Sequence, residues 1–222
     1  MNPLWVKTPN IIKRIYPNRV WSLPYTENKV YLTFDDGPIP EVTPWVLDLL
    51  NEFEAKATFF CIGKNVITNL KIFQRIIEEG HTIGNHTFDH LNGWKSKTRE
   101  YIENCEKFMD ILNQVQDNNS KHINQKLSII KLFRPPYGKL TSKQSKVLQK
   151  RGYKIYMWDV LSGDFSKNIS KEKCLQNVLK NTNPGSIIVF HDSLKAEKNL
   201  RYVLPKVLEF ISEKGWECSA IA

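Results

Sequence analysis

The 222-residue sequence lacks the features that mark membrane-spanning and secreted proteins. No segment approaches the ~18 to 20 consecutive apolar residues that a membrane-spanning helix needs. The first 21 residues are interrupted by Pro3, Lys7, Pro9, Lys13 and Arg14, and they contain no continuous apolar stretch typical of a secretory signal peptide. We therefore expect a cytoplasmic protein without a transmembrane span, with non-classical export left open.

Glycine-rich phosphate-binding motifs and paired cysteines are also missing. Neither G-x-G-x-x-G nor G-x-x-x-x-G-K-[ST] follows the first apolar run, which argues against a dinucleotide or nucleotide site. The four cysteines form no C-x-x-C pair, so buried free thiols are expected rather than disulfides or a thiolate metal site. They are Cys61, Cys105, Cys174 and Cys218.

Basic residues outnumber acidic ones. The chain has 32 Lys and Arg and 23 Asp and Glu, which gives a formal charge of +9. Such an excess can indicate a nucleic acid, an acidic glycan or a membrane surface as partner. The lysines are scattered, however, and there is no arginine-rich arm or aromatic–basic RNA-binding pattern. A lysine-rich surface is the preferred interpretation, and no nucleic-acid partner is expected.

What the sequence does contain is an alternation of short apolar runs with helical patterns, which predicts a parallel α/β sheet, either open or closed into a barrel. The expected strands are 29–34, 57–62, 81–85, 129–134, 153–159, 186–191 and 216–221. The expected helices are 43–54, 64–79, 98–116, 141–151, 171–181 and 196–214. The length fits a single domain.

Charged residues gather where these strands should end, at the edge on which parallel α/β folds build their sites. Asp35 and Asp36 end the first apolar run, and two adjacent carboxylates repel each other unless a cation takes up their charge. The alternative is an ordinary solvated turn, because Asp, Gly and Pro are common turn residues.

Histidines supply candidate partners for this acidic pair. His86 and His90 are spaced i, i+4, so a helical turn would point both rings the same way, although this spacing also arises by chance. Two histidines and one carboxylate form the usual open site for a catalytic divalent metal. His191 follows the sixth run; it is either a buried core histidine or an acid whose pKa Asp164 raises.

Three motifs carry a resemblance to a known family. They are TFDDGP at 33–38, HTFDH at 86–90 and RPPYG at 134–138. In order and spacing the chain resembles the polysaccharide deacetylases, the nodulation-factor deacetylase homology domain of carbohydrate esterase family four, over about residues 29–221. The resemblance implies an α/β fold, a distorted (β/α) barrel with about seven parallel strands. The catalytic domain would span 29–222, and residues 1–28 would pack on the barrel.

The resemblance also implies roles for individual residues. Asp35 would be the general base, oriented by Arg134. His191 would be the general acid, oriented by Asp164. The implied metal ligands are Asp36, His86 and His90. The implied oxyanion-hole donor is the backbone N–H of Tyr137. The cofactor would be one divalent metal ion, with zinc expected and cobalt or nickel as alternatives.

Three residues depart from the family pattern and affect the expected substrate rather than the expected activity. Leu161 and Phe165 replace an Asp and a Trp of the fourth motif, and Val189 replaces a Leu of the fifth. Phe165 would offer a weaker face for stacking a sugar, and Val189 would slightly enlarge the pocket for the acetyl methyl group.

The implied function is metal-dependent hydrolysis of N-acetyl, or O-acetyl, groups on an amino-sugar glycan by a monomer. An alternative is a cytoplasmic deacetylase or deformylase of a small or lipid-linked sugar. Basic and apolar residues at 7–16 would then make peripheral membrane contact, whereas the preferred interpretation is that this segment plugs the bottom of the barrel. A non-catalytic glycan-binding module is a third possibility, which would require an incomplete catalytic set.

Overall fold

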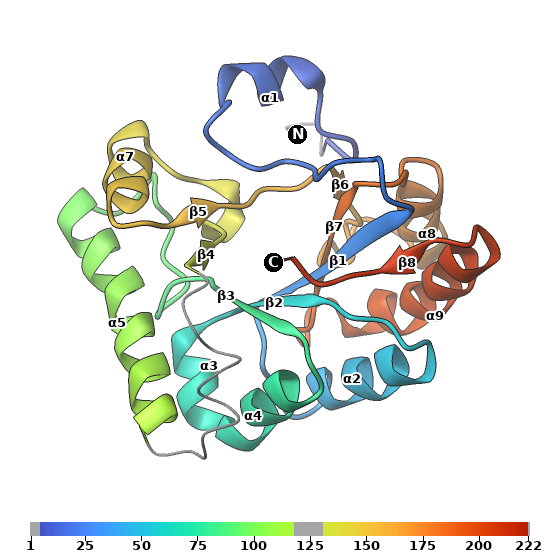
Figure 1. The fold of residues 1–222 in the computed structure, drawn as a ribbon, viewed down its shortest axis with the longest axis horizontal. Coiled ribbons are helices and arrows are strands. Elements are labelled where there is room, and N and C mark those ends of the chain that lie inside the picture. The colour runs from blue at the N-terminus through green and yellow to red at the C-terminus, as the bar shows by residue number, and fades with distance from the viewer. Residues whose placement is uncertain (1–4, 118–130, 222) are drawn as a thin grey trace.

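A curled parallel sheet with helices around its outside organises the chain (Figure 1). The computed structural model describes residues 5–117 and 131–221. The main sheet has the strand order β5-β4-β3-β2-β1-β7-β6, and β8 pairs with β1. The strands are β1 (Lys29–Asp35), β2 (Thr58–Cys61), β3 (Thr82–Asn85), β4 (Leu132–Phe133), β5 (Lys154–Ile155), β6 (Val160–Leu161), β7 (Ile187–His191) and β8 (Glu217–Cys218). The expected distorted (β/α) barrel of about seven parallel strands is confirmed.

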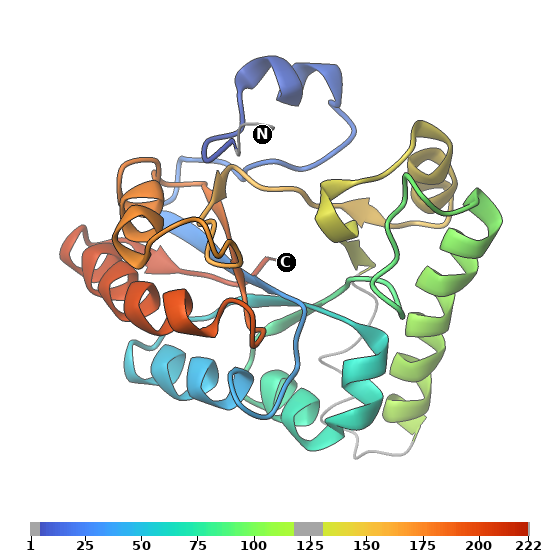
Figure 2. The ribbon, with the colours of Figure 1, turned by 180° about the vertical axis from the view of Figure 1, so that it is seen from behind.

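Helices cover the outer face of this sheet, as the view from behind also shows (Figure 2). They are α2 (Thr43–Glu52), α3 (Gly63–Thr68), α4 (Leu70–Glu78), α5 (Thr98–Asp117), α7 (Ser142–Lys150), α8 (Lys171–Leu179) and α9 (Glu197–Glu213). A short helix, α1 (Asn10–Ile15), stands apart from this layer, and the 3₁₀ turn η1 (Pro136–Gly138) follows β4. No helix in the described ranges is both long and apolar enough to cross a membrane.

Several expected elements differ in extent; the strand expected at 216–221, for example, is only the two-residue β8. The single helix expected at 64–79 is divided into α3 and α4 at Asn69, whose backbone (φ −125°, ψ 47°) is not helical. Of the single strand expected at 153–159, only Lys154–Ile155 is a strand, β5; β6 follows at Val160–Leu161, and the two pair with β4 and β7 at opposite ends of the sheet. Residues 156–159 therefore cross the open side of the barrel instead of continuing one strand. Of the strand expected at 129–134, residues 129–130 lie outside the described part.

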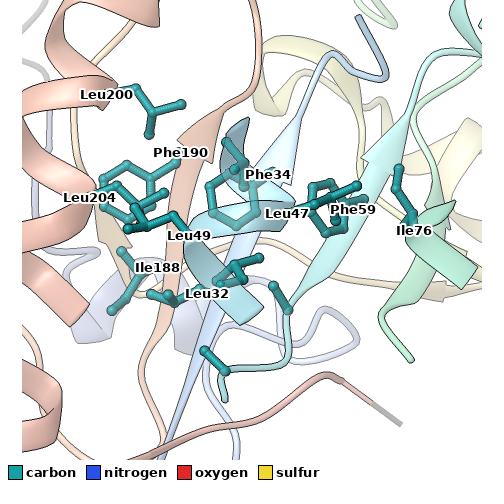
Figure 3. Close-up of a cluster of buried hydrophobic side chains, with 14 of the residues drawn as sticks. Leu32, Phe34, Leu47, Leu49, Phe59, Ile76, Ile188, Phe190, Leu200 and Leu204 are labelled. Atoms are coloured by element: carbon teal, nitrogen blue, oxygen red, sulfur yellow. The ribbon is translucent and has the colours of Figure 1, made fainter. Parts of the chain in front are cut away.

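The main core lies between the sheet and the outer helices (Figure 3). Phe34 of β1 stacks on Phe59 of β2 and on Phe190 of β7, with ring centroids 5.1 and 6.0 Å apart. Leu47 of α2 and Leu204 of α9 close over these rings, and all five side chains are buried. Each buried side chain of this size contributes roughly 1.5 to 3 kcal/mol, so this layer fixes the positions of the central strands. All four cysteines are buried and free, as expected.

Strand alternation sends the other residues of β1 into the barrel. Leu32 and Phe34 face the helices, so Thr33 and Asp35 face inward. Inside, both contact the side chain of Arg134, which is fully buried. The same alternation that builds the core therefore delivers a carboxylate to the inner edge of the sheet.

The N-terminal segment lies across the open side of the barrel, between the two strands that end the sheet (Figure 1). Val20 bridges to Tyr156, directly after β5, and Lys7 bridges to Val160 in β6. Backbone hydrogen bonds accompany both bridges, from Val20 N–H to the Ile155 carbonyl (2.8 Å) and from Leu161 N–H to the Val6 carbonyl (2.8 Å). Residues 6–20 thus join the two ends of the sheet.

One buried carboxylate holds this segment in place. Asp159 accepts hydrogen bonds from Lys7 Nζ (2.5 Å), Lys13 Nζ (2.6 Å) and Ser186 Oγ (2.7 Å). Its backbone carbonyl also accepts a bond from Thr8 N–H at 2.9 Å. Burial opposes ionisation, but the bonds from Lys13, Lys7 and Ser186 outweigh it and hold the pKa of Asp159 below its usual value. Asp159 is therefore an anchor for the N-terminal segment.

Candidate active site

Residues that follow four different strands meet at the carboxyl edge of the sheet. Asp35 ends β1 and is the register partner of His191, which ends β7. His86 and Arg134 directly follow β3 and β4. These residues are distant in sequence, and the parallel arrangement brings them together.

Asp36, His86 and His90 form a cluster in which one ligand atom from each side chain lies within 4.8 Å of the others. The Asp36 carboxylate oxygen Oδ1 is 3.2 Å from His90 Nε2 and 3.7 Å from His86 Nε2. Burial alone would raise the pKa of Asp36, but the hydrogen bond to His90 and the charge of His191 hold it far below its usual value. Asp36 is thus an anionic group beside two imidazole nitrogens.

The surroundings of His86 leave one ring nitrogen available as a ligand. Its Nδ1 lies 2.8 Å from the backbone carbonyl of Arg134, which can only accept, so Nδ1 carries the proton. Burial is the main reason that the pKa of His86 falls to about 4, so the ring is neutral at physiological pH. Nε2 therefore presents a lone pair toward Asp36, which is the usual arrangement for a metal-binding histidine.

The two histidines are not on a helical turn, as their spacing had suggested. Residues 86–90 form a bend in which Thr87 (φ 66°) and His90 (φ 57°) are left-handed. Asn85 and Asn104 hold this bend: their side-chain oxygens accept the N–H of Thr87 (2.8 Å), and of Phe88 and Asp89 (both 2.9 Å). Side-chain amides replace the hydrogen bonds that a helix would have supplied.

Strained backbone is concentrated at this edge. Five non-glycine residues in the described ranges have positive φ, and four of them belong to the site loops. These are Asp36 (83°), Thr87 (66°), His90 (57°) and Tyr137 (59°). Each such residue costs about 1 to 3 kcal/mol and persists where surrounding contacts impose it, which happens most often at functional sites.

Asp35 forms a buried ion pair with Arg134. The guanidinium Nη1 donates to Asp35 Oδ1 at 2.7 Å and to Thr33 Oγ1 at 2.7 Å, while Nη2 donates to the Met157 carbonyl at 2.9 Å. Arg134 is fully buried and its guanidinium lies 4.1 Å from the centre of the Phe60 ring. The arginine is held from several sides, so Asp35 keeps one orientation and has a second oxygen free of this pair.

His191 forms a second pair with Asp164. Its Nδ1 lies 2.8 Å from Asp164 Oδ1, and its backbone N–H donates to Oδ2 at 2.7 Å. Burial would lower the pKa of His191, but Asp164 outweighs it and raises the pKa to about 9. The edge of the His191 ring meets the Phe165 ring, with 4.9 Å between centroids. At neutral pH the site therefore holds a protonated imidazole with Nε2–H unclaimed by Asp164.

Sequence reasoning missed Asp192, the residue after His191. Its fully buried carboxylate accepts hydrogen bonds from Thr43 Oγ1 (2.6 Å) and Gly37 N–H (3.0 Å), and a Cβ on Gly37 would collide with it. Burial is the main cause that raises the pKa of Asp192 to about 8. Asp192 holds the turn that follows Asp36. The sequence shows an acid directly after a strand-end histidine. It does not show the hydrogen-bond partners of Asp192, because these lie some 150 residues earlier in the chain.

Six of the eight expected site residues line one cleft of about 1000 Å³, and the other two support it from behind. Those in the cleft are Asp35, Asp36, His86, His90, Tyr137 and His191. Arg134 and Asp164 bond to Asp35 and His191. The cleft also contains residues without an expected role: Trp5, Ile12, Tyr16, Arg19 and Trp21 from the N-terminal segment, and Trp94, Lys139, Trp158 and Lys195 from the barrel. The N-terminal segment is therefore a wall of the cleft rather than a plug at the barrel bottom.

Known proteins share this fold and its motifs. The family model for polysaccharide deacetylase matches residues 23–156. A peptidoglycan-N-acetylglucosamine deacetylase of Bacillus cereus is 39% identical over 173 residues, which cover 78% of this chain and 59% of that protein. A chitooligosaccharide deacetylase of Azorhizobium caulinodans is 36% identical over 169 residues, covering 75% of this chain and 74% of that protein. The chain thus spans about three fifths of the first relative.

A solved structure agrees over a greater length. The crystal structure of the Bc1960 peptidoglycan N-acetylglucosamine deacetylase, in complex with 4-naphthalen-1-yl-N-oxidanyl-benzamide, superposes with a TM-score of 0.83 at 33% identity. The match covers 96% of this chain and 95% of that one, so it includes the N-terminal segment and β6 to β8 as well as the region of the family model. By its sequence and its fold, the chain belongs to the polysaccharide deacetylase family.

Proposed function

We propose that this protein is a metal-dependent hydrolase that removes N-acetyl groups from an amino-sugar glycan. One observation carries the proposal: a two-histidine, one-carboxylate cluster shares a cleft with a buried Asp35–Arg134 pair and with the His191–Asp164 pair. The relatives named as deacetylases of N-acetylglucosamine-containing glycans support the substrate class.

The residues of the cluster fit a divalent metal ion. His86 offers a neutral Nε2, and Asp36 offers a carboxylate that stays ionised. Such a set suits zinc, with cobalt or nickel as alternatives. When bound, the ion would polarise the acetyl carbonyl and lower the pKa of a water molecule toward ~7.

Asp35 and His191 supply the proton transfers. Asp35 keeps one oxygen on Arg134 and uses the other to take a proton from the attacking water. His191, protonated at neutral pH, gives its Nε2 proton to the sugar nitrogen as the carbon–nitrogen bond breaks. Acetate and a free amine are the products. The raised pKa of His191, about 9, keeps this proton available at neutral pH, which matches the role of general acid.

Tyr137 would stabilise the charge that develops on the carbonyl oxygen. Its left-handed backbone turns the peptide unit at the start of η1, and the residue lies in the cleft 4.7 Å, ring to ring, from His90. A backbone N–H at such a position contributes about 3 to 4 kcal/mol to a transition state of this kind.

Acetate release tests this function. The purified protein is incubated with N-acetylated and O-acetylated glycans of matched length, with and without a chelator, and metal is then added back. We expect release from the N-acetylated glycans, loss of release with chelator, and recovery with zinc or cobalt. Release that persists in chelator, or release from the O-acetylated glycans alone, would contradict the proposal.

A membrane-facing sugar is the second candidate substrate, because α1 exposes apolar side chains. Ile11 and Ile15 are 61% and 57% exposed, and Arg14 between them is also exposed. Such a helix suits contact with an anionic bilayer and would bring the cleft to a lipid-linked sugar. Sedimentation with anionic liposomes, compared between the unmodified protein and the I11S/I15S variant, separates this candidate from a free glycan. Equal sedimentation of the two proteins excludes it.

A glycan-binding module without activity is disfavoured, because every residue of the expected catalytic set is present and lies at or directly behind the cleft.

A further inference from the structure

The cleft carries positive charge on three of its walls. Arg19 comes from the N-terminal segment, Lys139 follows η1, and Lys195 lies between β7 and α9. The only carboxylates among the residues that line the cleft are Asp35 and Asp36. Asp35 is neutralised by Arg134, and Asp36 belongs to the metal cluster, so neither offsets the three cations.

These cations have no carboxylate partner in the part of the chain that the structure describes, whereas Lys7, Lys13 and Arg201 elsewhere form ion pairs. Each lies instead beside an aromatic ring that also belongs to the cleft: Arg19 over Tyr16 (4.3 Å), Lys139 over Trp94 (5.4 Å) and Lys195 over Phe165 (5.6 Å). Cation–π contact attracts the cation without neutralising it.

A cation beside an aromatic ring can bind both the ring of a sugar and a charged substituent on it. An aromatic face packs against the apolar face of a sugar ring, and a cation beside it binds a negative group on the same or the next sugar. Because the rings restrict where the cations rest, less side-chain entropy is lost on binding. An uncharged glycan would use the rings but give the three cations no partner in exchange for the water it displaces from them, which is a cost.

Building on the proposed deacetylase function, we infer that the substrate of this cleft is an N-acetylated glycan with anionic substituents rather than a neutral one. Carboxylate and phosphate groups both satisfy the cations, because Lys binds either as a point charge and the guanidinium of Arg matches both. The formal charge of +9 adds long-range attraction for such a strand.

Acetate release from matched glycans tests this inference with the whole chain loaded with zinc. The four substrates are a neutral chitooligosaccharide, a carboxylate-bearing N-acetylated strand of the same length, that strand with its carboxylates methyl-esterified, and a strand carrying phosphodiesters. We expect kcat/KM to be roughly three- to tenfold higher for an anionic strand than for the neutral and esterified ones. The preference should decrease between about 0.02 and 0.3 M salt, because exposed charges are screened.

Charge variants show whether the three walls cause the preference. Lys139→Gln and Lys195→Gln should each lower the ratio of anionic to neutral kcat/KM, mainly through KM, and Lys195→Arg should retain it. Lys198→Gln is the matched control, since this exposed lysine lies close in sequence but not in the cleft. Arg19 is less informative because it also donates to the Leu140 carbonyl (3.3 Å).

The outcomes separate the two proposals. Equal rates on neutral and anionic strands, or a preference that the lysine variants leave intact, overturn the anionic substrate while the deacetylase function stands. A preference for one anionic strand identifies carboxylate or phosphate as the group recognised. Absence of acetate from all four substrates contradicts both proposals.

Discussion

Replacing Asp159 by Asn should release the N-terminal wall of the cleft while leaving the barrel folded. The substitution keeps the shape of the side chain but removes the charge that Lys7 and Lys13 share. It also turns one acceptor oxygen into an NH₂ group that faces a lysine ammonium, which cannot accept a hydrogen bond.

The size of the expected loss of stability follows from how deeply the side chains of Asp159, Lys7 and Lys13 are buried. The Asp159 side chain is 5% exposed, whereas those of Lys7 and Lys13 are 38% and 22% exposed. Breaking a fully buried ion pair costs about 3 to 5 kcal/mol. The lysines can turn toward water, which recovers part of this cost. We therefore expect a loss of roughly 2 to 3 kcal/mol in the free energy that holds the segment.

The loss of stability caused by Asp159→Asn should depend on pH. The pKa of Asp159 in the folded protein lies below its unfolded value of ~3.9, so its stabilisation is present above that value and is lost as the pH falls through the lower, folded pKa. The difference between the two proteins should therefore be largest near neutral pH and shrink below about pH 4.

Hydrogen exchange resolved by segment is the assay, with urea unfolding for the whole chain. Residues 6–21 should lose protection in the variant, while β1 to β3 keep theirs. Asp48→Asn is the control, because Asp48 is an exposed partner of Arg75 and its loss should cost less than ~0.5 kcal/mol. Unchanged protection of residues 6–21, or uniform loss throughout the barrel, would refute the anchoring role.

Three further predictions concern the chemistry. Asp36→Ala and His90→Ala should each abolish stoichiometric metal binding; full occupancy by elemental analysis would contradict their assignment as ligands. Asp35→Asn should retain metal but lower kcat by at least about 100-fold, as expected for a lost general base; a near-normal rate would exclude that role. The pH profile of kcat/KM should fall as the pH rises through about 9, where His191 loses its proton. Asp164→Asn removes the cause of the raised pKa and should move this descending limb to lower pH, and an unmoved limb would show that another group titrates.

The sequence predicted which residues meet at the carboxyl edge of the sheet, because these residues end or directly follow strands. A parallel sheet aligns strand ends, so residues after β1, β3, β4 and β7 meet whatever the loops do. The closure of the barrel was harder to predict. The run at 153–161 is mostly apolar, interrupted by Lys154 and Asp159, and no periodicity reveals that it leaves one edge of the sheet and joins the other.

The N-terminal wall was also beyond sequence reasoning, for a physical reason. Its contacts are isolated bridges and one buried carboxylate, which leave no alternation or helical repeat to recognise. The match to the family model at residues 23–156 likewise omits this wall, together with Asp159, Asp164 and His191. Its placement depends on a partner 152 residues away, as the Lys7–Asp159 pair shows.

This separation sets an order of assembly during synthesis. The residues of the N-terminal wall leave the ribosome well before their partners at 155–161, because the two groups are far apart in the sequence. The strands β1 to β3 can pair as they appear, whereas the wall must wait unpaired for β5 and β6. An incomplete chain therefore has strands in place but no finished cleft, and binding competence arrives late in translation.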